Sequence, residues 1–372
     1  MTIAVHISFS DTLDDPLKNF NYQCFNILAG KYPEQHFIFI FDKPYSPFVA
    51  AHENITPVLL SPQNRNRLLG HYWYNFKLPS ILNKYNADIF VSDRINASLR
   101  SSTKQCMIIQ DISFLEKEHA FSKTEKRYLN RYFKKFVEKI SCLAVTTAYQ
   151  TNKLAGLFPN AKDKLHTVGY GLRNVNETTS YNDIQSLKEK YTEGKDYFIG
   201  YITNASASNT TTLLKAFSAF KKRQLSNMQL VLALSAYLEQ DPVKDILTYK
   251  YRNDVKTITV ENDIQLSEIS SAAYAAIYLP AIESLEDEGL IALKNNIPLV
   301  TVSNEFCKSL YNDAALYSKP DDKNIAEKLM LLYKNENLRN DLANIGKLVS
   351  SIYTWENTAA NLWQAIQAST EQ

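Results

Sequence analysis

The chain has 372 residues, more than one hydrophobic core usually serves, so we expect two domains. Its 41 lysine and arginine residues nearly balance 39 aspartate and glutamate residues, and the net charge of +2 excludes a general electrostatic case for nucleic acid as a partner. No segment approaches the roughly 20 apolar residues of a membrane span. The first segment, MTIAVHISFSD, also lacks the basic and long apolar regions of a secretory signal, so we expect a cytoplasmic protein.

The first half of the chain alternates short apolar runs with helical patterns. The runs are TIAVHIS, HFIFIFD, TPVLLS, ADIFVSD, CMIIQD, LAVTT and LHTVGYG. Their nearly continuous apolar character is typical of parallel strands that are covered on both faces. We therefore predict a doubly wound α/β domain over residues 1–172, followed by a polar linker with a short helix at 173–194.

A second series of the same kind follows the linker. Its candidate strands are YFIGYIT, MQLVLALS, VKTITV, AAIYLP, PLVTVS and AALYS, again with helical segments between them. We predict a second domain over residues 195–350 and an amphipathic C-terminal helix within 351–372. The fold class expected is α/β, with two doubly wound Rossmann-like domains facing a cleft, a common place for a ligand.

Cysteines and histidines give no sign of a metal site. Cys24, Cys106, Cys142 and Cys307 are scattered without CxxC spacing, and three of them lie in or beside apolar segments. The six histidines have no metal-binding spacing. We expect buried, reduced thiols and no metal cofactor.

Several segments, in their order along the chain, resemble one enzyme family. IIQDISFLEKEHAFS, LAVTTAYQTNKL, YFIGYITNASASNTTTLLKAF and QLSEISSAAYAAIYLPAIESLEDEG are similar to segments of the retaining glycosyltransferases of the GT-B fold, most of all family four, also called group 1. TWENTAANLWQAI resembles the family's tail, which crosses back to the first domain. The resemblance implies transfer of a sugar, with retention, from a nucleotide-sugar donor to a glycan or lipid-linked acceptor in surface-polysaccharide assembly.

On the donor side, the resemblance places Glu283 beside the donor sugar. Further donor-binding residues implied by it are Thr203, Asn204, Ser206, Ser208, Asn209, Ser284, Leu285 and Glu286. The family's Arg and Lys, which stabilise the leaving diphosphate, fall on Ala207 and Ser208, and its ribose-binding Glu falls on Ile291. The simpler interpretation is a helix entry capped by Asn209 and a solvated acidic loop.

On the acceptor side, the family's His-Asp pair corresponds to Gln110 and Asp111, which we take as candidate catalytic residues beside Glu283. An amide cannot shuttle a proton at neutral pH as an imidazole can. Asn19 and Asn21 stand in the columns of the family's glycine-rich loop, and Arg94 follows the strand ADIFVSD, facing either the cleft or a surface ion pair.

Because these departures occur together while the scaffold segments are kept, two interpretations remain open. The leading one is a diverged transferase that holds its donor differently. The alternative is a catalytically inactive homologue that binds a glycan or serves as a partner or scaffold protein, and a binder of a non-nucleotide ligand is a third. The basic, amphipathic segment 123–140 is either a helix packed on the sheet or a peripheral contact with the inner membrane face.

Overall fold

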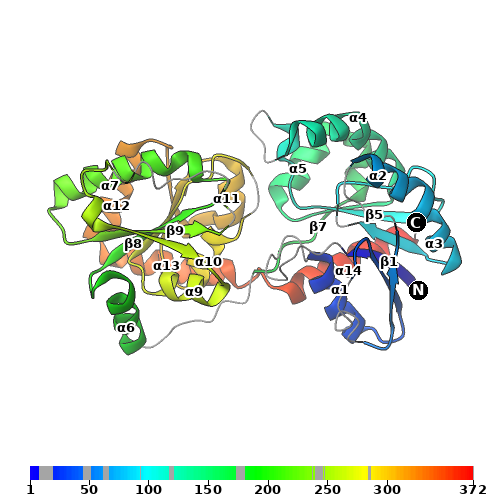
Figure 1. Ribbon diagram of the computed structural model, residues 1–372, viewed down its shortest axis with the longest axis horizontal. Coiled ribbons are helices and arrows are strands. Elements are labelled where there is room, and N and C mark those ends of the chain that lie inside the picture. Colours follow the sequence, from blue (N-terminus) through cyan, green and yellow to red (C-terminus); the bar gives the residue numbers. More distant parts are fainter. Residues whose placement is uncertain are drawn as a thin grey trace. The chain divides into compact units, whose positions relative to one another are not determined.

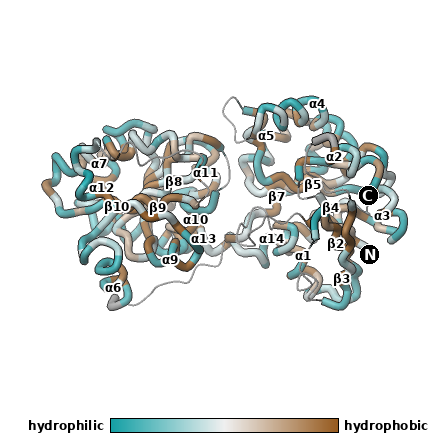
Figure 2. Tube along the Cα trace, viewed as in Figure 1, coloured by the Kyte–Doolittle hydropathy of each residue, from teal (hydrophilic) through white to brown (hydrophobic). Residues whose placement is uncertain are grey.

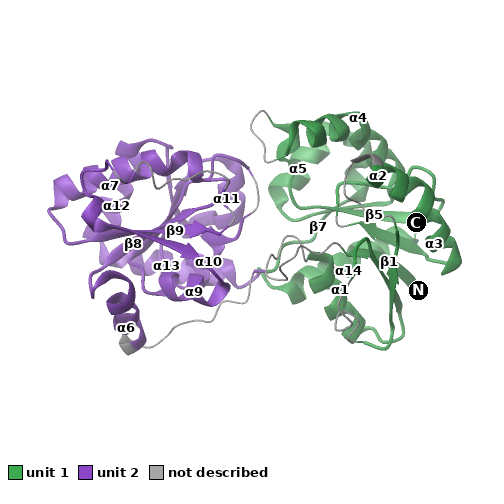
Figure 3. Cartoon of the chain, in the orientation of Figure 1, with its two compact units in different colours: residues 1–171, 353–372 green, residues 172–352 purple. Residues whose placement is uncertain are grey.

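The computed structural model describes residues 1–7, 20–44, 52–61, 67–92, 94–116, 121–172, 181–236, 238, 246, 248–283 and 286–371. The chain forms two compact units (Figure 3). Unit 1 comprises Met1–Gly171 and Tyr353–Gln372, and unit 2 comprises Leu172–Ile352.

Unit 1 is built on a seven-stranded parallel sheet in the order β3-β2-β1-β4-β5-β6-β7. Its strands are β1 (Thr2–Ile7), β2 (His36–Phe41), β3 (Ile55–Leu59), β4 (Ile89–Ser92), β5 (Lys104–Ile109), β6 (Cys142–Val145) and β7 (Leu165–Thr167). The strand order reverses between β1 and β4, which makes this the topological switch point of the sheet.

Helices flank this sheet (Figure 1). They are α1 (Phe20–Lys31), α2 (Arg67–Tyr72), the π-helical turn η2 (Trp73–Lys77), α3 (Leu78–Lys84), the 3₁₀ turn η3 (Ser113–Leu115), α4 (Lys123–Lys139), α5 (Ala148–Leu157), the 3₁₀ turn η4 (Pro159–Lys164) and α14 (Trp355–Glu371). Capping boxes begin two of them, with Ser122 and Glu125 at α4 and with Thr147 and Gln150 at α5.

The C-terminal helix α14 packs within unit 1. Trp355 lies edge-on to Phe20, with ring centroids 5.6 Å apart, and Trp363 stacks on Tyr32 at 4.4 Å. The position facing Trp355 must be a glycine, since a Cβ on Gly171 would lie 2.2 Å from the indole. Lys104 Nζ donates to the carbonyl of Thr370 at 3.0 Å.

Unit 2 has a six-stranded parallel sheet in the order β10-β9-β8-β11-β12-β13, with its switch point between β8 and β11. Its strands are β8 (Tyr197–Ile202), β9 (Gln229–Ser235), β10 (Val255–Val260), β11 (Ala275–Tyr278), β12 (Leu299–Val302) and β13 (Ala315–Ser318). Its helices are α6 (Tyr181–Thr192), the 3₁₀ turn η5 (Ala207–Asn209), α7 (Thr210–Gln224), the 3₁₀ turn η6 (Arg252–Asp254), α9 (Asp263–Ser271), α10 (Glu288–Lys294), α11 (Glu305–Tyr311), the 3₁₀ turn η7 (Asn312–Ala314), α12 (Asp322–Lys334) and α13 (Glu336–Ser350).

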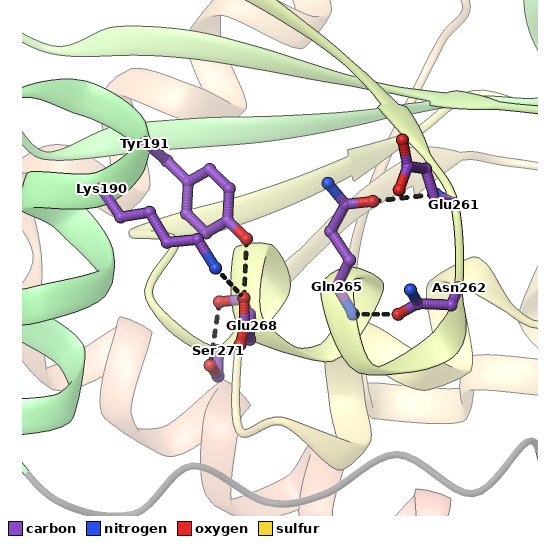
Figure 4. A network of polar contacts seen from close by, with 7 residues as sticks. All are labelled: Lys190, Tyr191, Glu261, Asn262, Gln265, Glu268 and Ser271. Carbon is purple, nitrogen blue, oxygen red and sulfur yellow. Dashed lines mark hydrogen bonds and ion pairs between the residues drawn. The ribbon is translucent and has the colours of Figure 1, made fainter.

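Each apolar run selected from the sequence overlaps a strand, and Figure 2 shows apolar residues concentrated along strands such as β2 and β9. The two doubly wound parallel sheets of the predicted fold class are therefore confirmed. The short helix expected within 173–194 is α6, which belongs to unit 2. It is fastened to α9 by Lys190 and Tyr191, which both contact Glu268 Oε2, at 2.6 and 2.7 Å (Figure 4).

The amphipathic segment at 123–140 forms α4. Leu129, Phe133, Phe136 and Val137 on one side of it are buried against the sheet of unit 1, while its basic residues are mostly exposed. None of the helices in the described part of the chain combines the length and apolar character needed to cross a bilayer.

Candidate functional site

In unit 2, the carboxyl ends of β8 and β11 lie side by side at the switch point. Ligands of open α/β sheets bind outside this end, at this position in the strand order. The segments that follow the two strands are 203–209 and 279–287, and they contain all the donor-side candidates. Ser284 and Leu285 lie outside the described residues.

The loop after β8 is closed by its own hydrogen bonds. The Ser206 hydroxyl accepts from Thr203 N at 2.9 Å and donates to the Tyr201 carbonyl at 3.0 Å. Thr203 and Ser206 are buried, whereas Asn204 and Ser208 are exposed. Asn204 and Ser208 are therefore the exposed polar side chains of this loop, and Asn209 is half-buried.

Two further contacts join the loop after β8 to the loop after β11. Ala281 N donates to the Ala205 carbonyl at 2.7 Å, and the Asn209 side-chain amide donates to the Leu279 carbonyl at 2.9 Å. The expectation that Asn209 caps the next helix is wrong, because Asn209 occupies the N-cap position of α7 but makes no side-chain capping bond. Its amide holds the two loops together instead.

Glu286 forms the third connection between these loops. Its Oε2 accepts from the Tyr278 hydroxyl at 2.7 Å. Its carboxylate also accepts hydrogen bonds from the Thr203 hydroxyl and the Ala205 N–H. Burial raises the pKa of the Glu286 carboxyl above its ordinary value, and the adjacent Asp287 adds to the rise, while the three hydrogen bonds oppose it.

Glu283, the candidate beside the donor sugar, is half-buried and lies near α11. Burial raises the pKa of the Cys307 thiol to about 12, and the charge of Glu283 contributes to that rise. Cys307 accepts a weak hydrogen bond from the Thr301 hydroxyl at 3.7 Å. Ile291, in the column of the family's ribose-binding Glu, is fully buried on α10.

Unit 1 has a buried polar chain at its own switch point. The Tyr74 hydroxyl lies 3.2 Å from His6 Nδ1 on β1 and 2.9 Å from Ser92 Oγ on β4. Because Ser92 donates its one proton to the Arg94 carbonyl, Tyr74 donates to Ser92 and accepts from His6. This count of protons places a hydrogen on Nδ1 of the imidazole.

Two of the acceptor-side candidates, Asn21 and Arg94, contact members of the hydrogen-bonded chain of His6, Tyr74 and Ser92, and two others follow the neighbouring strand β5. Asn21 is buried on α1, and its amide donates to the His6 carbonyl at 2.9 Å, while Asn19 lies outside the described residues. Arg94 meets the chain through its backbone. Gln110 and Asp111 follow β5, where Asp111 Oδ1 accepts from Ser113 N at 2.6 Å.

Gln150 on α5 links the ends of β5 and β6. Its Oε1 accepts from the backbone N–H groups of Thr146 and Thr147 at 3.0 and 3.1 Å. Its Nε2 donates to the Gln110 carbonyl at 2.8 Å. The backbone of the candidate pair at 110–111 is therefore held from α5, and this side chain is itself 1% exposed.

The sequence analysis did not select His6, Tyr74, Gln150 and Tyr278. Each of these side chains joins segments at the carboxyl ends of the strands in its sheet. A signal was present for two of them: His6 and Tyr278 stand near the carboxyl ends of otherwise apolar strand runs, where a buried polar atom needs a partner. In the described part of the chain, no three His, Cys, Asp or Glu side chains are grouped so that they could hold a metal ion.

No protein-family model matches the chain, and no curated protein matches it in sequence. Solved structures do match it over its length. A glycosyltransferase from Rickettsia africae ESF-5 has a TM-score of 0.70 at 12% identity, covering 99% of this chain and 98% of its own. HepE from Anabaena, in complex with UDP-glucose, has a TM-score of 0.69 at 14% identity, covering 100% of both chains.

A Listeria monocytogenes protein assigned as a UDP-N-acetylglucosamine 2-epimerase has a TM-score of 0.66 at 10% identity, covering 100% of this chain and 96% of its own. At such identities the likeness shows the fold and not the reaction. The two Rossmann-like sheets, each with its switch point, and the full-length match to these structures establish that the chain has the GT-B fold.

Proposed function

We propose that the protein is a glycosyltransferase that moves a sugar from a nucleotide-sugar donor to a glycan or lipid-linked acceptor, with retention, in the assembly of a surface polysaccharide. The observation that carries this proposal is the match to HepE over the whole of both chains, since HepE was solved with UDP, with UDP and glucose, and with UDP-glucose. The switch point of unit 2, with its polar loops, is where such a donor would bind.

In this proposal the exposed Asn204 and Ser208 contact the donor phosphates, and Glu283 lies beside the donor sugar. Asp111, at the end of β5, serves the acceptor. No metal takes part, so turnover would continue in the presence of EDTA. A protein assigned as an epimerase has a similar fold. The product formed from the donor sugar must therefore be identified, to distinguish transfer from epimerisation.

A peripheral contact with an anionic membrane, where a lipid-linked acceptor would lie, is part of the same proposal. The side of α4 that faces away from the core exposes Arg127, Arg131, Lys134 and Lys135. Clustered exposed cations are attracted to anionic headgroups and lose that attraction at high salt. Sedimentation with vesicles of anionic or neutral lipid tests it: binding to neutral vesicles only would contradict an electrostatic contact.

The first test of function is calorimetric titration with UDP, GDP, ADP and dTDP and with the matching sugar nucleotides. Micromolar binding of one base would support a surviving donor site and select the donor for an acceptor search. If neither the folded wild type nor a variant that lacks Glu286 binds any of them, the transferase proposal is wrong, and the inactive, partner-binding alternative becomes the one to pursue.

Glu283→Gln tests the chemistry directly. If Glu283 stabilises charge that develops at the donor sugar, its loss lowers the transfer rate by roughly a hundredfold or more. The melting temperature should change by no more than about 2 °C, as for a half-buried loop side chain outside the core. An unchanged rate would remove Glu283 from the mechanism.

A further inference from the structure

Three hydrogen-bond donors from two segments converge on one carboxylate in unit 2. They are the Tyr278 hydroxyl at the end of β11, and the Thr203 hydroxyl and Ala205 N–H in the loop after β8. A set of one backbone N–H and two hydroxyls can bind any anionic oxygen, whether it belongs to a carboxylate or to a phosphate. The structure shows this set already filled, by Glu286.

Further acidic and phenolic groups lie around the Tyr278–Glu286 bond. Asp287 is adjacent and buried, Glu288 begins α10, and the Tyr311 hydroxyl of α11 lies against Gly289, where a Cβ would be 2.4 Å from it. At positions 207 and 208 of the loop, where a cation would favour an anion, the chain has Ala and Ser. While the Glu286 carboxylate stays in place, its negative charge repels a diphosphate that enters here.

We propose that Glu286 is a resident anion in the phosphate position of this site, and that a ligand diphosphate binds only by displacing it. This inference rests on the proposed function, because it assigns the donor set to the phosphates of that donor. It predicts that the wild-type protein binds diphosphates weakly, since each binding event must first free the three donors from an internal competitor. It also makes Glu286 a determinant of affinity rather than a ligand of the donor.

Burial makes this competitor displaceable. The pKa of the Glu286 carboxyl is raised by burial, so the charged form is less stable here than in water. Swinging the side chain into solvent recovers that hydration, which offsets part of the lost hydrogen bonding. The three hydrogen bonds therefore hold the carboxylate in place, but an anionic ligand can displace it.

The test is calorimetric binding of inorganic pyrophosphate and of UDP to wild type, Glu286→Ala and Glu286→Gln at pH 7.5. Removing the resident charge should tighten pyrophosphate binding about tenfold or more, equivalent to about 1.4 kcal/mol. Glu286→Gln keeps the side-chain volume and should show the same direction. If circular dichroism shows that Glu286→Ala does not fold, the comparison of Glu286→Gln with wild type is the test.

Glu268→Ala is a matched control. Glu268 is also a carboxylate of unit 2 that accepts from a tyrosine hydroxyl, at 2.7 Å from Tyr191, but it lies on α9 beside α6 (Figure 4). Its removal should leave pyrophosphate affinity at the wild-type value. Equal gains in both variants would mean that general charge, and not the occupied donor set, limits binding.

The two proposals fail in different ways. If wild type binds UDP well and Glu286→Ala binds it more weakly, Glu286 supports the donor, and the resident-anion inference is overturned while the function stands. If pyrophosphate binding tightens in the Glu286 variants but no sugar nucleotide is bound or turned over, the inference stands and the proposed function is wrong. Unchanged pyrophosphate binding in both Glu286 variants overturns the inference.

Discussion

At the switch point of unit 1, a histidine, a tyrosine and a serine form a buried chain, and amides of Asn21 and Gln150 fasten the neighbouring segments. At the switch point of unit 2, the corresponding place is held by the Glu286 carboxylate. Both sheets begin with the same strand order, 3-2-1-4 in sequence terms. The strand order thus determines which strand ends are neighbours, and the side chains determine whether a charged group lies between them.

This difference has a consequence for what each end can respond to. Hydroxyl and amide hydrogen bonds keep their strength over the usual pH range, so the links around Gln150 and Tyr74–Ser92 hold the strand ends of unit 1 without a charged group. A buried carboxylate gains or loses its charge with pH and can be replaced by another anion. On our proposal, the end of unit 2 is therefore the one at which an anionic ligand can displace a side chain.

The largest expected effect comes from removing Gln150. Gln150→Ala leaves two backbone N–H groups and the Gln110 carbonyl without their partner, at a cost of about 3 kcal/mol in the free energy of unfolding. That corresponds to a fall of roughly 6–12 °C in melting temperature.

Tryptophan fluorescence reports this change selectively. The chain has 3 tryptophans, and Trp73, Trp355 and Trp363 all belong to unit 1. Gln150→Glu serves as the control, since it retains the acceptor but loses the donor to Gln110, and should fall between wild type and Gln150→Ala. A fluorescence transition within about 2 °C of wild type would show that water replaces the missing side chain.

A smaller loss is expected when Tyr74 becomes phenylalanine. The ring stays in the core, but His6 Nδ1 and Ser92 Oγ lose the hydroxyl between them, for about 2 kcal/mol. Tyr278→Phe removes the equivalent hydroxyl from unit 2 and should leave the tryptophan transition unchanged while shifting the transition seen by circular dichroism. If both variants move the same transition, the two units do not unfold separately, and the comparison between their ends has to be made by another probe.

Much of the architecture was predictable from the sequence, because parallel strands covered on both faces need nearly continuous apolar runs, and HFIFIFD is such a run. The donor-side candidates came from the family resemblance, and the structure brings their two loops together because β8 and β11 are neighbouring strands. Their individual contacts did not follow from the sequence. The Tyr278–Glu286 bond joins the last residue of β11 to a residue eight positions later, in the loop that follows, and nothing in their spacing predicts it.

The same limit explains why His6 was missed and Asn209 misassigned. His6 looks like an ordinary member of an apolar strand until Tyr74, 68 positions away, is seen to reach it. Asn209 stands at the N-cap of α7, but its side-chain amide donates instead to the Leu279 carbonyl in the loop after β11. Local preference is a weak guide where a tertiary partner competes for the same group.

The pH dependence of the stability of unit 2 distinguishes Glu286 from Glu268, the two carboxylates that accept a hydrogen bond from a tyrosine there. Because the pKa of Glu286 is raised in the folded state, mainly by burial, its contribution is full below its ordinary value of 4.5 and is lost as pH rises through the raised pKa. Glu286→Gln should therefore gain stability relative to wild type as pH increases from 4.5, by about 1.4 kcal/mol for each unit of pKa shift.

Glu268 gives the opposite sign, which makes it the control for that measurement. The Lys190 contact, then the Tyr191 hydroxyl, lower the pKa of Glu268, so its contribution is present above 4.5 and is lost as pH falls through the lowered pKa. Glu268→Gln should lose stability relative to wild type at neutral pH and match it in acid. Parallel pH profiles of the two variants, followed by circular dichroism in urea, would contradict the assignment of either shift.

The smallest effect expected is at Asn209, where one side-chain hydrogen bond joins the loops after β8 and β11. Asn209→Ala should cost about 1 kcal/mol, and Asn209→Asp should not restore it, because the contact to the Leu279 carbonyl needs an N–H donor. Asn262 is the matched control, since its side chain accepts from Gln265 N at 2.9 Å as a true N-cap of α9 (Figure 4). Aspartate can replace an N-cap asparagine, so Asn262→Asp should stay within about 0.5 kcal/mol of wild type. If Asn209→Asp is as stable as wild type, Asn209 acts as a helix cap after all. The Ala281–Ala205 bond and Glu286 would then be the contacts that join the loops after β8 and β11.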